Sequence, residues 1–139
     1  MGSASDNVAK LKHAYRQWHE SKGASVNAWL DLMVDDVRCY SIAAGPPEAE
    51  FTAPINSKKD FERYFKGLLD DWEMIHYTTN EFIAEGERVA VRGSTAWRNR
   101  KTGKLVDTPK ADFWTFRDGK AVEFHEFYDT AALIAAAKP

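Results

Sequence analysis

The sequence of 139 residues contains a single cysteine, Cys39, which excludes an internal disulfide and a metal cluster held by several thiolates. It has no apolar run close to the roughly 20 residues that a membrane-spanning helix requires. Its opening segment, MGSASDNVAK, also lacks the apolar stretch of a secretory signal. We therefore expect a cytoplasmic protein without a membrane partner, in which Cys39 is a small buried hydrophobe.

Charge of one sign is not in excess either, since 19 Lys and Arg stand against 21 Asp and Glu and the formal net charge is −2. Nucleic-acid binding requires a basic face, which this balance does not supply. The HxH and HExxH spacings of common metal sites are absent as well. We therefore expect no nucleic-acid partner, no metal and no cofactor.

Aromatic side chains, by contrast, are abundant at 13% of the residues, with five Trp, five Tyr and eight Phe. Large rings can line a cavity for an apolar ligand as well as fill a core. The composition therefore favours a pocket and leaves an aromatic-rich core or dimer face open as alternatives. The length and the 44% of hydrophobic residues correspond to a single domain, residues 1–139, that can bury its own core.

The order of the hydrophobic patterns predicts an α+β domain. Stretches with helical spacing come first, and strand-like stretches separated by turn signals follow. Four of these strands form an antiparallel meander, which is expected to curve over the helices and enclose a cavity. The proline-rich Gly45–Asn56 segment reads as a surface loop that forms a rim or lid. The predicted helices are 7–21, 28–36, 57–72 and 130–138, and the predicted strands are 37–42, 74–87, 88–100, 108–119 and 120–129.

The segment DGKAVEFHEFYD, Asp118–Asp129, places ionisable groups among aromatic ones on a predicted strand. Successive side chains of a strand point to opposite faces, so Glu126 shares one face with Val122, Phe124 and Tyr128. Neither face is purely apolar, and the polar groups on the concave face therefore need an explanation. The other face carries Glu123, His125, Phe127 and Asp129, and we expect His125 to lie at the surface or in an interface.

This order of elements, with VDDV leading into the first strand and RDGKAVEFHEFYD near the end, resembles the SnoaL-like branch of the nuclear transport factor 2-like superfamily. The resemblance covers roughly Val8–Ala137. Ketosteroid isomerase and limonene epoxide hydrolase share the fold. The resemblance implies a cone, in which a strongly curved antiparallel sheet wraps over three N-terminal helices around an internal pocket. It also implies a homodimer.

Single residues can be compared with those relatives. Ketosteroid isomerase-like sites use a helical Tyr and a strand carboxylic acid as hydrogen-bond donors, which correspond here to Tyr15 and to Asp112 in ADFWTF. The carboxylate base of that family corresponds to Ser41, which cannot act as a base, so the resemblance does not imply ketosteroid isomerisation. Epoxide hydrolases place an acid where Glu126 stands and use an Arg, for which Arg92 is the candidate. The segment VRGST lacks the Asp that accompanies their Arg.

We hypothesise a cofactor-free enzyme that moves a proton on a small apolar molecule with a carbonyl or similar oxygen, by isomerisation, cyclisation or hydration. Glu126 is the expected base, and Asp112 and Tyr15 are expected to donate hydrogen bonds to the oxygen. Arg92 is expected to orient the ligand. Two close carboxyls in an apolar cavity raise the pKa of one of them, which provides a proton donor and an acceptor near neutral pH. The expected pocket walls are Trp18, Trp114, Phe124 and Tyr128.

An alternative reading makes the same carboxyls structural. Asp112 and Glu126 could belong to a buried ion-pair network, for which the candidate partners are Arg92, Arg98 and Lys110. The protein would then be a non-catalytic ligand-binding or dimeric interaction domain. The protonation state of these carboxyls distinguishes the two interpretations. The proposed enzyme needs one carboxyl with a pKa above its ordinary range.

Overall fold

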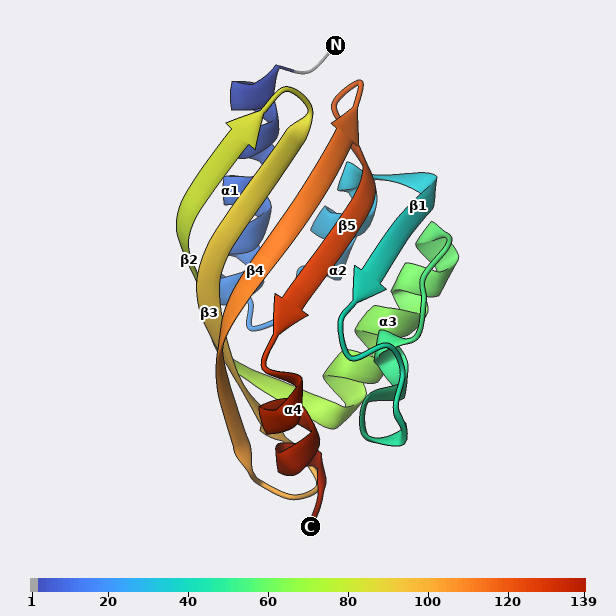
Figure 1. The fold of residues 1–139 in the computed structure, drawn as a ribbon, viewed down its shortest axis with the longest axis vertical. Helices are drawn as coiled ribbons and strands as arrows, with labels where there is room; N and C mark the ends of the chain where they lie inside the picture. The colour runs from blue at the N-terminus through green and yellow to red at the C-terminus, as the bar shows by residue number, and fades with distance from the viewer. Residues whose placement is uncertain (1–2) are drawn as a thin grey trace.

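The computed structural model describes residues 3–139 (Figure 1). Met1 and Gly2 lie outside the described residues, and so does the part of the expectation about a secretory signal that rests on them. The helices are α1 (Ala4–Glu20), α2 (Val26–Leu32), the 3₁₀ helix η1 (Pro47–Thr52), α3 (Lys58–Asp71) and α4 (Thr130–Ala137). The strands are β1 (Met33–Ser41), β2 (Trp72–Glu85), β3 (Arg88–Asn99), β4 (Leu105–Arg117) and β5 (Lys120–Tyr128).

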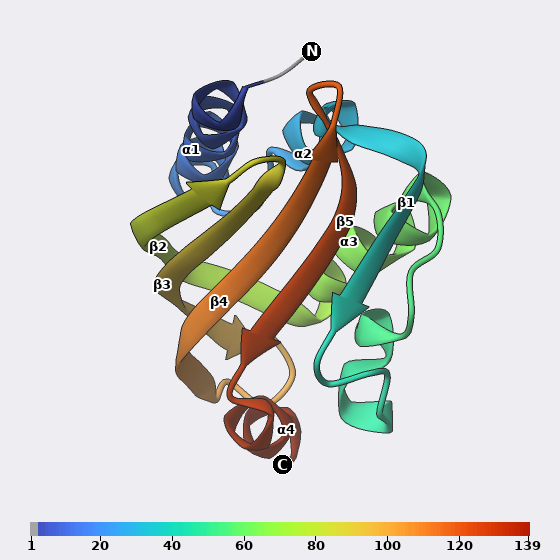
Figure 2. The same cartoon turned by 45° about the horizontal axis from the view of Figure 1, so that its top comes forward.

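The strands form one mixed sheet in the order β1-β5-β4-β3-β2. Strands β2 to β5 are the predicted antiparallel meander, and β1 joins its edge by pairing parallel to β5. The sheet is strongly curved and open, and α1, α2 and α3 lie on one side of it (Figures 1 and 2). This arrangement confirms the predicted α+β cone.

Capped helices with apolar stripes cover the sheet. Ser3 caps α1 by accepting the backbone N–H of Asp6 at 3.1 Å, and Ser57 caps α3 by accepting that of Asp60 at 3.0 Å. Among residues 3–139, no helix has both the length and the apolar character needed to cross a membrane. The buried stripes are Leu11, Ala14, Tyr15 and Trp18 in α1 and Phe61, Tyr64, Phe65 and Leu68 in α3.

Several element boundaries differ from the prediction, and tertiary pairing explains two of the differences. Residues 33–36 were expected to continue the second helix, but they belong to β1, where Met33 is buried and pairs with Ala121 of β5. Strand β4 begins earlier than predicted because Leu105 pairs with Arg98 of β3. Backbone partners from distant segments thus override local helix and turn preferences.

A β-bulge at Asn80 interrupts the pairing of β2. The residues on either side of Asn80 pair with Gly93 and Arg92, which are consecutive in β3. The two backbones approach closely here, since a Cβ on Gly93 would lie 1.9 Å from the carbonyl oxygen of Thr78. Only glycine fits at this position without a shift of the strands.

We expect Gly93→Ala to lower the free energy of unfolding by about 3 kcal/mol, because the added methyl overlaps a backbone atom. Gly86→Ala is the matched control. Gly86 lies in the β2–β3 turn at φ +58° with nothing within 4 Å of an added Cβ. Gly86→Ala should therefore lower the free energy of unfolding by only about 1 kcal/mol, the cost of placing an alanine in the left-handed conformation. Urea unfolding measures both variants, and equal losses would contradict the close approach at Gly93.

Candidate functional site

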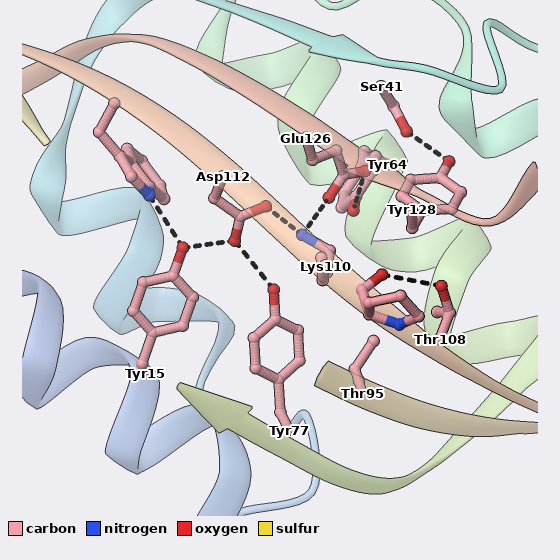
Figure 3. Close-up of polar contacts among 12 residues, drawn as sticks. Tyr15, Ser41, Tyr64, Tyr77, Thr95, Thr108, Lys110, Asp112, Glu126 and Tyr128 are labelled. Carbon is pink, nitrogen blue, oxygen red and sulfur yellow. Dashed lines mark hydrogen bonds and ion pairs between the residues drawn. The ribbon is translucent and has the colours of Figure 1, made fainter. Parts of the chain in front are cut away.

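Three ionisable side chains meet on the concave face where β4 and β5 run side by side (Figure 3). Lys110 and Asp112 are two residues apart on β4, and a strand points such residues to the same face. Asp112 lies directly opposite Glu126 of β5 in the antiparallel ladder. We refer to Lys110, Asp112 and Glu126 as the charged cluster.

Lys110 joins the two carboxylates of the charged cluster. Its Nζ is in contact with Asp112 Oδ1 and lies 3.0 Å from Glu126 Oε1. The exposed side-chain fractions are only 9% for Lys110, 3% for Asp112 and 4% for Glu126. At such burial each carboxylate needs a compensating partner. One ammonium therefore compensates two acids, and the cluster contains more acid than base.

Asp112 is also the acceptor for two tyrosines. Tyr15 OH donates to Asp112 Oδ2 at 2.6 Å, and Tyr77 OH donates to the same oxygen at 3.0 Å. Trp114 Nε1 in turn donates to Tyr15 OH at 2.9 Å. Because Tyr15 accepts from Trp114, its own proton points to Asp112. The carboxylate of Asp112 is thus surrounded by donors from α1, β2 and β4.

Glu126 is held from the other side of the cluster. Tyr64 OH of α3 donates to Glu126 Oε2 at 2.8 Å. Next to it, the hydroxyl oxygens of Ser41 and Tyr128 lie 2.6 Å apart, where Ser41 of β1 pairs with Glu126 in the parallel ladder. Ser41, whose position the resemblance assigned to a base, therefore lies beside Glu126 as a buried hydroxyl.

Burial and neighbouring charges set the protonation of these groups. Burial raises the pKa of Asp112 above its ordinary value, although the ammonium of Lys110 opposes the shift. For Lys110, burial alone would lower the pKa, but the charges of Asp112 and Glu126 outweigh burial and hold the pKa above its ordinary value. Burial, assisted by the nearby carboxylates, raises the pKa of the three tyrosines that donate to Asp112 and Glu126. The tyrosines therefore remain hydrogen-bond donors at neutral pH, and Lys110 remains charged.

The charged cluster faces a cavity of about 90 Å³. Aromatic rings form much of its wall, where Trp114 stacks on Phe124 with ring centroids 4.2 Å apart and on Trp29 at 5.5 Å. Phe51 of η1, within the Gly45–Asn56 segment, is buried and lines the cavity too. A cavity of roughly 150 Å³ binds benzene in an unrelated protein, so a ring-sized ligand requires wall side chains to move apart.

The structure brings seven of the eight predicted site residues to this cavity and leaves Arg92 outside it. The Arg92 side chain is 67% exposed, and its Nε donates to Glu81 Oε1 at 3.0 Å. Val89 and Val91 are the residues that β3 buries here, so alternation turns Arg92 to the outer face. The prediction that Arg92 lies in the pocket is therefore corrected, and Lys110 is the cation at the cavity. The predicted residues among its lining are Tyr15, Trp18, Asp112, Trp114, Phe124, Glu126 and Tyr128.

The hypothesis from sequence included Lys110 only as an alternative ion-pair partner and omitted Tyr64 and Tyr77. A signal for Lys110 exists, because its spacing of two from Asp112 on a strand puts both on one face. Tyr64 belongs to the apolar stripe of α3, which indicates that it faces inward but not which group it contacts. Tyr77 had no usable signal, because a register shift at Ile75 reverses the alternation that begins at Met74.

The remaining reactive side chains lie outside the charged cluster. His125 is on the opposite face of β5, where its Nε2 lies 3.3 Å from Glu123 Oε1. Cys39 is buried, and burial raises the pKa of its thiol, which keeps it protonated. Over residues 3–139, no three side chains among His, Cys, Asp and Glu gather in an arrangement that would hold a metal ion.

Residues 13–124 match a family model described as a SnoaL-like domain. No curated protein matches the sequence. Among solved structures, a nuclear transport factor 2-like protein from Burkholderia xenovorans LB400 shares 21% identity over 98% of each chain, with a TM-score of 0.79. A protein provisionally classed as a SnoaL-like polyketide cyclase, from Jannaschia sp. CCS1, has 17% identity over 98% of this chain and 94% of its own, with a TM-score of 0.75. The protein TerC, crystallised with polyporic acid, has 19% identity over 96% of this chain and 99% of its own, with a TM-score of 0.78. At these identities the structures share a fold.

We expect Lys110→Met to lower the free energy of unfolding by about 4 kcal/mol at about pH 8, because two buried carboxylates lose their cation. The loss should shrink as the pH falls towards about 5. An acid whose pKa is raised in the folded state binds protons more tightly there than in the unfolded chain, so stability increases as the pH falls through that range. Removal of the Lys110 charge raises the pKa of Asp112 further and strengthens this trend.

Urea unfolding at both pH values measures the loss. The control is Lys101→Met in the exposed β3–β4 turn, which should change stability by less than about 0.5 kcal/mol. A deficit in Lys110→Met that grows on acidification would show that the carboxylates do not depend on this ammonium.

Proposed function

The chain belongs to the SnoaL-like family, and we propose that it is a cofactor-free acid–base enzyme for a small apolar molecule with a carbonyl or similar oxygen. One observation carries the proposal: two buried carboxyls, Asp112 and Glu126, share one lysine at an aromatic cavity. Acid–base catalysis uses a proton acceptor and a fixed positive donor that are close together and shielded from water.

We assign the contact with the substrate oxygen to Lys110. An ammonium has three N–H donors, and its contacts with Asp112 and Glu126 use two of them. The third has no acceptor among residues 3–139 and remains for an oxygen in the cavity. Tyr15, which the hypothesis from sequence made a donor to that oxygen, donates to Asp112 instead. The charge of Lys110 would stabilise the negative charge that develops on the oxygen.

Glu126 is the proposed base. Lys110 contacts its Oε1 and Tyr64 contacts its Oε2, so the carboxylate is oriented before substrate binds. Glu126 would remove a proton from the carbon next to the carbonyl. The electrons of the broken C–H bond form a C=C bond, and the π electrons of the C=O bond move to the oxygen beside Lys110. Return of the proton to a different carbon completes an isomerisation, and an aldol-type cyclisation or a hydration uses the same two groups. Asp112 positions Lys110 and, through its other oxygen, Tyr15.

A neutral and compact substrate suits this site best. The cavity walls are largely aromatic, and the charged cluster contains two acids and one base, which disfavours an anionic substrate in a buried site. The crystallisation of TerC with polyporic acid supports small-molecule binding by this fold. A ring-sized substrate would enter as wall side chains move.

A non-catalytic ligand-binding domain is the second candidate. Each carboxylate oxygen of Asp112 and Glu126 already contacts Lys110 or a tyrosine hydroxyl, as in a structural ion-pair network. The two candidates share this arrangement, because burial raises the pKa of Asp112 despite the ammonium beside it in either case. Proton transfer to a substrate therefore distinguishes them.

Hydrogen exchange at carbon tests the proton transfer without knowledge of the product. We expect the protein to catalyse deuterium incorporation next to the carbonyl of small cyclic ketones in D₂O, measured by proton NMR of the ketone. Glu126→Gln should lower that rate by about 10²- to 10⁴-fold, since an amide cannot accept the proton. Glu123→Gln, on the exposed face of the same strand, is the matched control and should keep the wild-type rate.

Equal exchange rates in the two variants would remove Glu126 from the mechanism. Binding without exchange would favour the second candidate function. Such binding would be seen as quenching of tryptophan fluorescence that weakens in Trp114→Phe.

We also propose that the protein is a cytoplasmic homodimer that assembles through the outer face of the sheet. An aromatic cluster on this face supports the assembly. Phe113 packs on Phe127 with ring centroids 5.7 Å apart, and Tyr40 lies 5.8 Å from His125. Phe113 is 49% exposed and Tyr40 is 41% exposed, so these rings offer apolar area that contact with a second copy would bury.

Light scattering should give twice the mass of one chain for the wild type, and Phe113→Asp should shift the protein to the mass of one chain. The substituted carboxylate would be buried without a partner in the dimer but solvated in the monomer. A dimer that survives this substitution, or a wild type that is monomeric, would contradict the proposed interface.

A further inference from the structure

Outside the cavity, a groove lies between α1 and β2, and we propose that it is a second site, which binds small aromatic carboxylates. The groove is open to solvent and offers about 620 Å³ of space. The two elements lie side by side at one edge of the molecule in both ribbon views (Figures 1 and 2). We call it the α1–β2 groove, lined by Lys12, Arg16 and His19 of α1 and by Thr79, Asn80 and Phe82 of β2, among others.

The ionisable groups on the helix side of the α1–β2 groove are basic, apart from a tyrosine hydroxyl. Lys12, Arg16 and His19 are spaced i, i+4 and i+7, which puts them on one face of α1. In the described part of the chain, no Asp or Glu lines the groove. Within residues 3–139, neither Lys12 nor Arg16 forms an ion pair. Two like charges at i and i+4 repel each other, so an anion bound between them would relieve that repulsion.

His19 adds a donor of fixed direction. Its Nδ1 accepts the backbone N–H of Tyr77 at 3.1 Å. A neutral imidazole that accepts at Nδ1 carries its proton on Nε2, so Nε2–H is left to donate to a ligand. An apolar ring lies near the same donors, since Lys12 Nζ is 5.4 Å from the centre of the Phe82 ring. Cationic donors next to a ring match a carboxylate attached to an aromatic group.

The strand side of the groove is polar and uncharged where the bulge lies. Thr78, Thr79 and Asn80 line it, and the bulge leaves Asn80 without a direct partner in β3. Bulges of this kind redirect side chains next to functional sites. Their hydroxyl and amide groups can donate to a carboxylate without adding charge. Gly93, which permits the close backbone approach at Thr78, is therefore part of what shapes the groove.

The same anion is disfavoured in the cavity. Tyr15 and Tyr77 line both spaces, and their rings stack with centroids 5.6 Å apart. Both hydroxyls donate to Asp112 on the cavity side. A carboxylate in the cavity would meet two acids and one base, whereas in the groove it meets basic groups alone. The two spaces thus select ligands of different charge, which makes the α1–β2 groove separable from the proposed catalytic site.

The test uses the full chain, labelled with ¹⁵N, and sodium benzoate as the probe. We expect benzoate to shift the backbone amide signals of Thr78, Thr79 and Asn80, and to leave the indole N–H signals of Trp97 and Trp114 in place. Lys12→Gln/Arg16→Gln should weaken benzoate binding by about tenfold or more, because the carboxylate loses both cationic partners. Lys12 and Arg16 are exposed, so this variant should fold, and unchanged amide signals elsewhere verify that.

The matched control is Lys59→Gln/Arg63→Gln, which removes the same charge at the same spacing from exposed positions of α3. It should change benzoate binding by less than about twofold, as distant exposed charges are screened by salt. Benzyl alcohol, which keeps the ring without the charge, should not shift the groove amides. If both double variants weaken benzoate binding equally, the effect comes from net charge alone and the proposal is overturned. Indole shifts larger than the amide shifts would place benzoate in the cavity and would overturn it as well.

Discussion

The contact of Lys110 with both Asp112 and Glu126 is the interaction on which the interior of this protein depends. Two carboxylates in an aromatic core are tolerated only with a cation and further donors beside them. The ammonium orients both carboxylates, and each carboxylate then accepts hydrogen bonds from tyrosine hydroxyls of other elements. The three tyrosines that donate to them come from α1, α3 and β2, so helices and sheet meet at the charged cluster. The aromatic walls then pack around a centre whose position is already determined.

Such a centre is costly compared with an apolar core of the same shape. Replacement of buried ion pairs by well-packed hydrophobic residues is often neutral or stabilising. A polar cluster that breaks the rule of an apolar interior is therefore typical of a functional site. The cavity beside the cluster also indicates a functional site, because a protein interior without a ligand site is normally packed to high density. These two departures occur at the same place, between β4, β5 and the helices.

The fold could be predicted from the sequence to a large extent, because strand periodicity and turn signals are local properties. The Asp118–Asp129 segment shows this, since alternation alone put Glu126 and Phe124 on one face. The errors arose where a single-residue irregularity decides the face. Arg92 required the register of β3, and Tyr77 required knowledge of the shift at Ile75. The hydrogen bond from Tyr64 of α3 to Glu126 depends on tertiary packing, which no local pattern encodes.

The parallel pairing of β1 with β5 has a consequence for how the chain folds. It joins an early strand to the last one, and the hydrogen bond between Tyr15 and Asp112 spans 97 residues of sequence. Contacts between such distant segments slow folding, because long loops must close before the contacts form. The charged cluster itself is local, because Asp112 and Glu126 pair across the β4–β5 hairpin. The tyrosines that cover it are not local, since Tyr15 and Tyr64 come from helices distant in the sequence. We therefore expect the cluster to lose its water only when these helices pack on the hairpin, later than the hairpin itself forms.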